Sequence, residues 1–169
     1  MATQYKHLTI LESDGPPSES EIRSIEAVLG TTLPVDFRAF IGVANGGHLP
    51  YLVNVPPHAD GEPMAFNVIF STKPDERGTY GYDTFIGEIK NARQVFQVPP
   101  AVLPFSHDGG GSMLFLDLTP EGNGRVVAFV EGLPAWTGLR KESAFIEVAH
   151  SFSEFVDLLY PDPENDYTE

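Results

Sequence analysis

Residues 31–47, TTLPVDFRAFIGVANGG, contain the clearest helix signature in the chain. Apolar side chains recur there at positions i, i+3, i+4 and i+7, the spacing of one face of an α-helix. They are Phe37, Phe40, Ile41 and Ala44. Pro34 marks the start, because proline is favoured in the first turn of a helix, and the Asn-Gly-Gly sequence at 45–47 favours a left-handed stop. The stretch therefore predicts a short amphipathic helix.

A second helix is predicted immediately before it, in SESEIRSIEAVLG at 18–30. Ser18 and Glu21 have the spacing of a capping box, and Gly30 is placed to end the helix. One face is apolar at helical spacing. It carries Ile22, Ile25, Val28 and Leu29. The two helices and their tight link predict a helical hairpin.

The middle of the chain predicts a β-hairpin, a loop and a helix. Segments 51–55 and 65–70 are rich in β-branched and aromatic residues and are bounded by proline and glycine, as strands of a hairpin are. Residues 71–83 are polar and glycine-containing, which predicts a long exposed loop. Residues 83–96 predict a helix that Gly87 weakens. Its inward residues are Phe85, Ile86, Ile89 and Ala92.

The last third predicts two central strands and a final helix. Segments 112–118 and 125–131 are apolar on both faces, as strands buried in the middle of a sheet are. Ser151 and Glu154 predict a second capping box, opening a helix that stops at Tyr160 before a proline. The element order predicts a single α+β domain over residues 1–160, with helices packed against a largely antiparallel sheet. Residues 161–169 are then an acidic C-terminal tail.

The stretch PFSHDGGGSMLFLDL, residues 104–118, has three interpretations. An oxyanion loop of the lipase type requires a G-x-S-x-G elbow elsewhere in the chain, and the sequence has none. A phosphate-binding loop requires a following lysine and a helix, whereas these glycines lead into a strand. A bend between strands requires only residues that tolerate positive φ, which Asp-Gly-Gly-Gly supplies. The bend is the favoured interpretation.

Composition excludes several classes of protein. The 169 residues include 24 acidic and 10 basic residues, giving a net charge of −14 and disfavouring nucleic-acid and anionic-membrane partners. On charge alone, solubility explains the excess better than a basic partner does. The absence of cysteine excludes disulfides and thiolate sites. No signal peptide or membrane span is recognisable, so a cytoplasmic protein is expected.

Candidate catalytic and metal-binding residues do not form a pattern. The five histidines are scattered without the spacing of metal ligands. Asp75 and Glu76 are adjacent in the exposed loop, where a solvated turn is the more common role. For Trp136, core packing and a surface anchor are equally plausible. We therefore predict no catalytic residue, no metal and no cofactor.

Three separated segments together resemble the SUKH superfamily, also called the Smi/Knr family. The first is I-x-x-I-E-x-x-L-G-x-x-L-P-x-D-F-R-x-F-I-x-x-x-N-G-G, from Ile22 to Gly47. The second is L-P-F-x-x-D-G-G-G-x-x-x-F-L-D-L followed by G-R-V-V-A-F, and the third is S-F-x-E-F-V-x-L-L near the C-terminus. They occur in the expected order between about residues 18 and 160.

The resemblance implies an α+β domain without catalytic residues, in which motif positions form the framework. These positions are Leu33, Pro34, Phe37, Phe40, Asn45, Gly46, Gly47, Asp108, Gly109, Gly110 and Asp117. Bacterial members act mainly as immunity proteins that bind a toxin of an interbacterial competition system, and fungal relatives regulate cell-wall assembly through protein contacts. An immunity protein is the expected function, and a regulatory scaffold is the alternative.

The loop at 71–83 departs from the family pattern and is the candidate partner-binding segment. Carboxylates surround two tyrosines there, which suggests an acidic patch with aromatic anchors. Its candidate residues are Asp75, Glu76, Tyr80, Tyr82 and Asp83. Such a patch would suit a basic toxin directed at nucleic acid, such as a nuclease, because it could cover the toxin's basic face.

Overall fold

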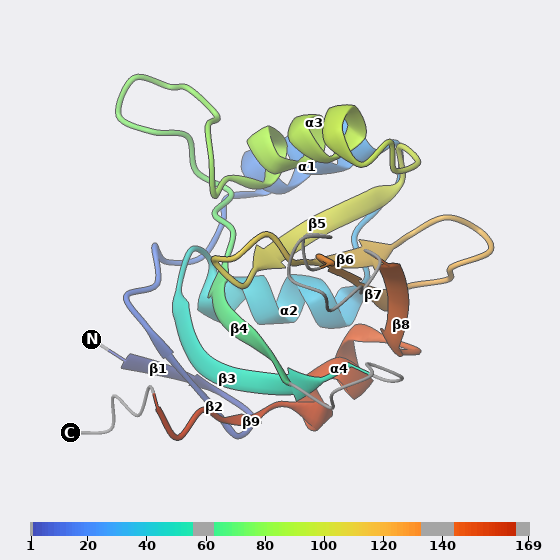
Figure 1. Ribbon diagram of the computed structural model, residues 1–169. Helices are drawn as coiled ribbons and strands as arrows, with labels where there is room; N and C mark the ends of the chain where they lie inside the picture. Colours follow the sequence, from blue (N-terminus) through green and yellow to red (C-terminus); the bar gives the residue numbers. More distant parts are fainter. Residues whose placement is uncertain (1, 56–62, 133–143, 165–169) are drawn as a thin grey trace.

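The computed structural model describes residues 2–55, 63–132 and 144–164 (Figure 1). The helices are α1 (Glu19–Leu29), α2 (Val35–Ala44), α3 (Phe85–Val95) and α4 (Phe152–Leu158). The strands are β1 (Ala2–Tyr5), β2 (Leu8–Leu11), β3 (His48–Asn54), β4 (Pro63–Ile69), β5 (Val102–His107), β6 (Met113–Asp117), β7 (Arg125–Val130), β8 (Ala144–Ala149) and β9 (Tyr160–Pro161). The single α+β domain expected from the sequence is confirmed.

The strands form one curved antiparallel sheet. Strands β1 to β8 follow one another in chain order, and β9 pairs with β3. Chain neighbours are therefore sheet neighbours, as tight connections favour in an antiparallel sheet. The sequence pattern did not predict β1, β2, β8 or β9. Strands β1, β2 and β9 have only four, four and two residues, and β1 carries two consecutive polar residues, Thr3 and Gln4. Strand β8 has six residues, so its length does not explain why it was missed.

Helix boundaries follow the predicted caps, with two corrections. The Ser18 and Glu21 capping box is present, and Gly30 ends α1 at φ 77°. After α2 the left-handed conformation is adopted by Gly46, at φ 69°. Asn45, the first residue of the predicted stop, is not left-handed and has a φ of −47°. At α4 the Ser151 hydroxyl accepts from the Glu154 N–H, but Glu154 Oε2 accepts from the N–H of His150. The predicted second capping box is thus only half formed.

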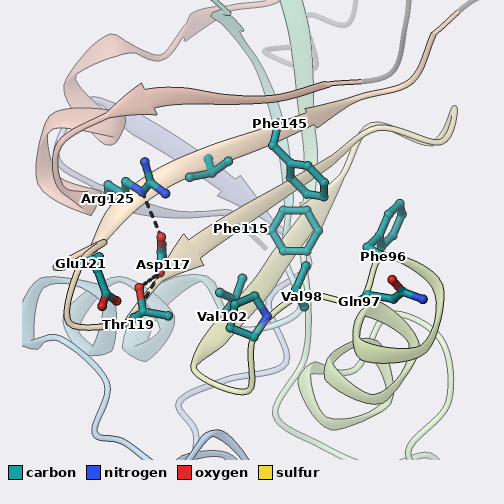
Figure 2. A pocket seen from close by; sticks show the side chains of 12 residues that line it. Phe96, Gln97, Val98, Val102, Phe115, Asp117, Thr119, Glu121, Arg125 and Phe145 are labelled. Atoms are coloured by element: carbon teal, nitrogen blue, oxygen red, sulfur yellow. Dashed lines mark hydrogen bonds and ion pairs between the residues drawn. The ribbon is translucent and has the colours of Figure 1, made fainter.

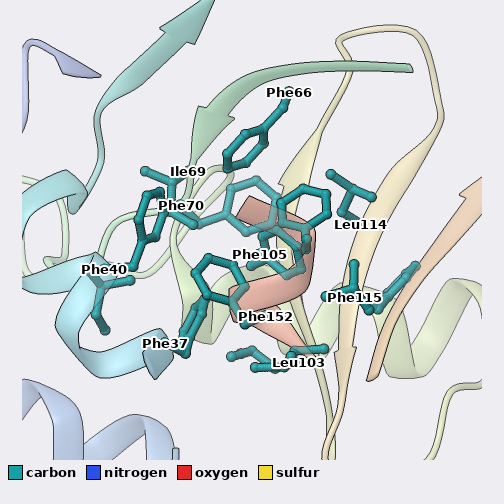
Figure 3. Close-up of a cluster of buried hydrophobic side chains, with 14 of the residues drawn as sticks. Phe37, Phe40, Phe66, Ile69, Phe70, Leu103, Phe105, Leu114, Phe115 and Phe152 are labelled. Carbon is teal, nitrogen blue, oxygen red and sulfur yellow. The ribbon is translucent and has the colours of Figure 1, made fainter. Parts of the chain in front are cut away.

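The main core lies between the sheet and helices α2 and α4 (Figure 3). It contains eight phenylalanines that are each no more than 1% exposed. We call these the inner cluster: Phe37, Phe40, Phe66, Phe70, Phe85, Phe105, Phe152 and Phe155. Their rings meet mostly edge to face, with the centroids of Phe37 and Phe152 5.0 Å apart. Such pairs add to the stabilisation that burial provides.

The polar residues of the motif around α2 join segments that are distant in sequence. The Asp36 carboxylate accepts from the Phe37 N–H at 2.8 Å and from the N–H and hydroxyl of Ser153 at 3.1 and 3.0 Å. It therefore ties the first turns of α2 and α4 together. These hydrogen bonds give a physical reason for a carboxylate between proline and phenylalanine in the motif.

Asn45 is fully buried at the end of α2 and connects that end to the segment after β2 and to the loop after β4. Its side chain donates to the Thr72 hydroxyl at 2.8 Å and the Gly15 carbonyl at 3.2 Å, and accepts from the Thr72 N–H at 2.8 Å. A Cβ on Gly46 would lie 2.1 Å from the Asp14 carboxylate. Only glycine fits this close approach at a positive φ.

The glycine-rich stretch is a bend between β5 and β6, as predicted. Gly109 and Gly111 have φ values of 84° and 104°. The Asp108 carboxylate accepts from the N–H groups of Gly110 and Ser112 at 2.7 and 3.1 Å, which fixes the turn. Asp108 and Gly110 themselves do not use positive φ.

The ordered sheet continues past residue 160. Tyr160 and Pro161 form β9 against Leu52 and Tyr51, and the Asp162 N–H donates to the Pro50 carbonyl at 2.9 Å. Pro161 and Asp162, which composition assigned to the acidic tail, thus belong to the folded body.

Candidate partner-binding surfaces

The loop at 71–83 projects from the body beside α3 (Figure 1). Its base is closed by backbone hydrogen bonds: the Ser71 N–H donates to the Asp83 carbonyl, and the Phe85 N–H donates to the Ser71 carbonyl, both at 2.9 Å. Residues 74–79 are all exposed. The prediction of a long exposed loop is confirmed. The hydrogen bonds at its base hold the two ends of the loop together.

The structure gives the predicted loop residues different positions. Asp75 Oδ1 accepts from the N–H groups of Arg77 and Thr79 at 2.9 and 2.8 Å, so this carboxylate holds a turn. Glu76 is exposed. Tyr82 is 87% exposed, whereas Tyr80 is half-buried against the core. Tyr82 and Glu76 are therefore exposed, and Asp75 is exposed but also holds the turn.

Asp83 connects this loop to the glycine-rich bend. Its Oδ1 lies 2.7 Å from His107 Nε2, and His107 Nδ1 accepts from the Gly109 N–H at 3.1 Å. Asp83 also has a φ of 62°, in the left-handed region. Sequence reasoning treated the loop and the bend separately because Asp83 and His107 are 24 positions apart in the chain.

A buried carboxylate lies beneath this junction. Glu88 is 5% exposed, and its Oε1 accepts from the Asp83 N–H at 3.3 Å. Burial raises the pKa of Glu88, and the neighbouring Asp83 carboxylate also raises it, against the lowering effects of the Asp83 N–H and His107. Sequence periodicity placed Glu88 on α3 but gave no sign that it would be buried.

A second surface lies at the other end of α3 (Figure 2). It lies on the face of β6 that carries Phe115, opposite the face of Leu114 and Leu116. Here four rings form the outer cluster: Phe96, Phe115, Phe129 and Phe145. Between Phe96, Phe115 and Phe145 lies an open hollow of about 380 Å³. Phe145 is 51% exposed, although Phe115 at its base is buried. We call this cavity the outer hollow.

One end of the outer hollow is charged. Asp117 Oδ2 accepts from Arg125 Nε at 2.9 Å, and Asp117 Oδ1 accepts from the N–H and hydroxyl of Thr119 at 3.1 and 2.6 Å. Burial alone would raise the pKa of Asp117, but these hydrogen bonds and the Arg125 charge together hold it below its usual value. Asp117 is thus an ionised framework residue, and Glu121 lines the same end.

Sequence reasoning missed the outer hollow. It described segment 125–131 as apolar on both faces. Because side chains alternate along β7, Arg125 lies on the same face as Val127 and Phe129, and that face therefore has a charged end. That alternation was the available signal. The partner side chain Phe145 lay in a segment for which no strand was predicted.

The two surfaces are separated by α3. The loop ends where α3 begins, and Phe96, its C-terminal cap, lines the outer hollow. Eleven helical residues span about 16 Å at 1.5 Å per residue. The loop and the outer hollow therefore lie at opposite ends of one helix.

Within residues 2–55, 63–132 and 144–164, no cluster of three or more histidine, aspartate or glutamate side chains could hold a metal ion. No helix in the same part of the chain is long and apolar enough to cross a bilayer. Trp136 and His58 lie outside the described residues.

The family model described as SMI1 / KNR4 family (SUKH-1) matches residues 16–158. This chain belongs to the SUKH-1 family. The match covers the motifs around α1 and α2, the glycine-rich bend and α4, whose structural roles are described above. A search of curated proteins gives no match.

Proposed function

We propose that this SUKH-1 protein is a non-enzymatic immunity protein that binds and neutralises a cognate bacterial toxin. The observation that carries the proposal is the family match over residues 16–158, because bacterial members of the family act mainly in this way. The proposed site of action is the cytoplasm.

A basic, nucleic-acid-directed toxin is the partner class that the charge favours. A net charge of −14 attracts a basic surface and repels nucleic acid, so the inhibitor would compete with the toxin's substrate. The exposed carboxylate of Glu76 and the exposed ring of Tyr82 offer an acidic contact and an aromatic anchor on one loop.

Genetic context and protection from toxicity test the function. The C-terminal domain encoded by the gene directly upstream is expressed in a bacterial host with and without this protein, and growth is measured. Protection of growth, with a stable complex on size-exclusion chromatography, supports the proposal. If the upstream domain is not toxic, or if growth is not restored, the immunity function is rejected and a regulatory scaffold for an endogenous protein becomes the better account.

Binding kinetics test the contribution of the loop. Association with the toxin domain should slow between low and physiological salt, because the Debye length shortens from about 30 Å at 0.01 M to about 8 Å at 0.15 M. Glu76→Lys should lower the on-rate, and Tyr82→Ala should raise the off-rate. Asp75 is a poorer target than the sequence alone suggested, because its replacement would also break the turn. Unchanged kinetics in both variants would place the interface away from this loop.

A further inference from the structure

The outer hollow combines an aromatic wall with unbalanced negative charge. The centroid of Phe145 lies 6.0 Å from that of Phe115 and 6.4 Å from that of Phe96, so the three rings surround one space. Half of the Phe145 side chain remains exposed there. Exposed apolar surface with a polar rim is typical of interaction sites.

The charged end of the outer hollow lacks a second cation. Arg125, its only cation among the described lining residues, is held by Asp117 at 2.9 Å and by Glu147 at 3.7 Å. Glu121 has neither a hydrogen bond nor an ion pair to its side chain within the described part of the chain. Two carboxylates, Asp117 and Glu147, therefore share the Arg125 guanidinium, while Glu121 lines the same hollow. The Glu147 contact with His150 at 3.2 Å adds a cation only when the imidazole is protonated.

The spacing of the two ends matches an extended chain. Phe115 and Asp117 are two residues apart on β6 and lie on the same face, which separates the apolar and charged ends by about 7 Å. In an extended partner segment, side chains at positions i and i+2 also share one face at about the same separation. An apolar side chain and a basic side chain at these positions would reach the rings and the carboxylates together.

We propose that the outer hollow binds an extended segment of a partner protein that presents an apolar side chain and, two residues later, an arginine or lysine. The apolar side chain packs against Phe145 and Phe115, and the cation lies at the charged end, which Asp117 and Glu121 line. This inference rests on the proposed function, since it gives the toxin a second contact on the opposite end of α3 from the loop. A second copy of this chain is a poor occupant, because each copy carries a charge of −14.

Short peptides test the recognition chemistry without the toxin. The ¹⁵N-labelled full chain is titrated with acetyl-Leu-Thr-Arg-amide, and with acetyl-Leu-Thr-Glu-amide and acetyl-Ser-Thr-Arg-amide as matched probes. The first peptide should shift the amide signals of residues 119–127 and 145–147 with a dissociation constant in the millimolar range. The other two should bind at least about fivefold more weakly, because each lacks one of the two contacts.

Variants locate the site. Glu121→Lys and Phe145→Ser should each raise the dissociation constant of acetyl-Leu-Thr-Arg-amide by about three- to fivefold. Glu164→Lys and Val35→Ser change charge and exposed apolar surface elsewhere and should leave binding unchanged. Equal binding of all three peptides, shifts confined to other residues, or no binding at millimolar concentration would each overturn the proposal.

The same variants separate this inference from the proposed function. If the wild-type protein protects cells and Glu121→Lys and Phe145→Ser bind the toxin domain as tightly as wild type does, the outer hollow is not the contact but the immunity function stands. If the wild-type protein does not protect, the immunity function fails, and the peptide titration still decides whether the hollow recognises an apolar and basic pair.

Discussion

The sheet carries aromatic clusters on its two faces, and they differ in how completely they are buried. Each phenylalanine of the inner cluster is at most 1% exposed, enclosed by the sheet, α2 and α4. In the outer cluster Phe115 is equally buried, but Phe145 remains 51% exposed. Strand β6 contributes to both faces, through Leu114 and Leu116 on one and Phe115 on the other.

The difference separates stability from recognition. Apolar area that is removed from water on folding stabilises the fold by about 25 cal/mol per Å². Area that remains exposed contributes nothing to folding and can still be buried by a partner. The inner cluster should therefore be sensitive to every truncation, whereas the outer cluster should tolerate truncation at Phe145 while losing binding.

Phe40→Ala should have the largest effect. The ring is fully buried and lies within 5.0 Å, centroid to centroid, of Phe152. Its removal leaves a cavity and should lower the free energy of unfolding by about 3 to 5 kcal/mol, measured by urea denaturation. Val35→Ala on the same helix is the control, since Val35 is 85% exposed. An unchanged midpoint for Phe40→Ala would contradict the inner cluster as the source of stability.

Asn45→Ala should have the second-largest effect on the free energy of unfolding, because it removes three hydrogen bonds behind the inner cluster. The buried Thr72 N–H would lose its acceptor, and an unsatisfied buried group costs about 1 to 3 kcal/mol. Asn67→Ala, which removes a single hydrogen bond to the Asp108 carbonyl, should cost less. Equal losses in the two variants would mean that the connection to Thr72 adds no stability.

Asp117→Asn tests the charged end of the outer hollow through the pH dependence of folding stability. The folded-state pKa of Asp117 lies below its ordinary value, so its ionised form stabilises the fold at pH values above about 3.9. At pH 7 the variant should be less stable by about 1 to 2 kcal/mol. This difference should shrink as the pH falls through the lowered pKa, because the wild-type carboxyl then becomes protonated.

Chemical denaturation at a series of pH values measures that difference. Asp157→Asn is a suitable control, since its carboxylate is 68% exposed and lies 3.9 Å from Lys6 Nζ. A difference between wild type and Asp117→Asn that stays constant down to acidic pH would show that the ionised carboxylate is not the stabilising form.

Phe145→Ser should have the smallest effect on stability, about 1 kcal/mol or less, since half of the side chain is already in water. Its denaturation midpoint should stay close to that of wild type. A loss comparable to that of Phe40→Ala would abolish the distinction between the two clusters and assign Phe145 to the core.

Local signals predicted the helices well. The Ser18 capping box, the stop at Gly30 and the apolar face of α2 act within a few residues of chain, so their chemistry is visible in the sequence. Strand β9 was missed because its partners, Tyr51 and Leu52 of β3, lie far away in the sequence. Strands β1 and β2 form a short hairpin, and its position depends on the packing of α2 against β1, including the contact of Tyr5 with Phe40. Strand formation depends on such neighbours more than on local composition.

The candidate surfaces were predicted only in part. Exposure of the loop at 71–83 follows from its polar composition, but the sequence could not show that Tyr80 would turn toward the core and Tyr82 toward solvent. The ion pair of Asp83 with His107 and the burial of Glu88 depend on which segments the sheet and α3 bring together.

The sequence by itself determined the family, the α+β class, the two N-terminal helices and the glycine-rich bend, because each depends on motifs or on contacts within a short stretch of chain. Tertiary structure alone decided that the sheet would have two aromatic faces and that one would remain partly open. Which phenylalanine is buried depends on what packs over it: α2 and α4 cover the inner rings, whereas Phe96 only borders the space beside Phe145. The physical reason is that burial is a property of the assembled layers and not of any single segment.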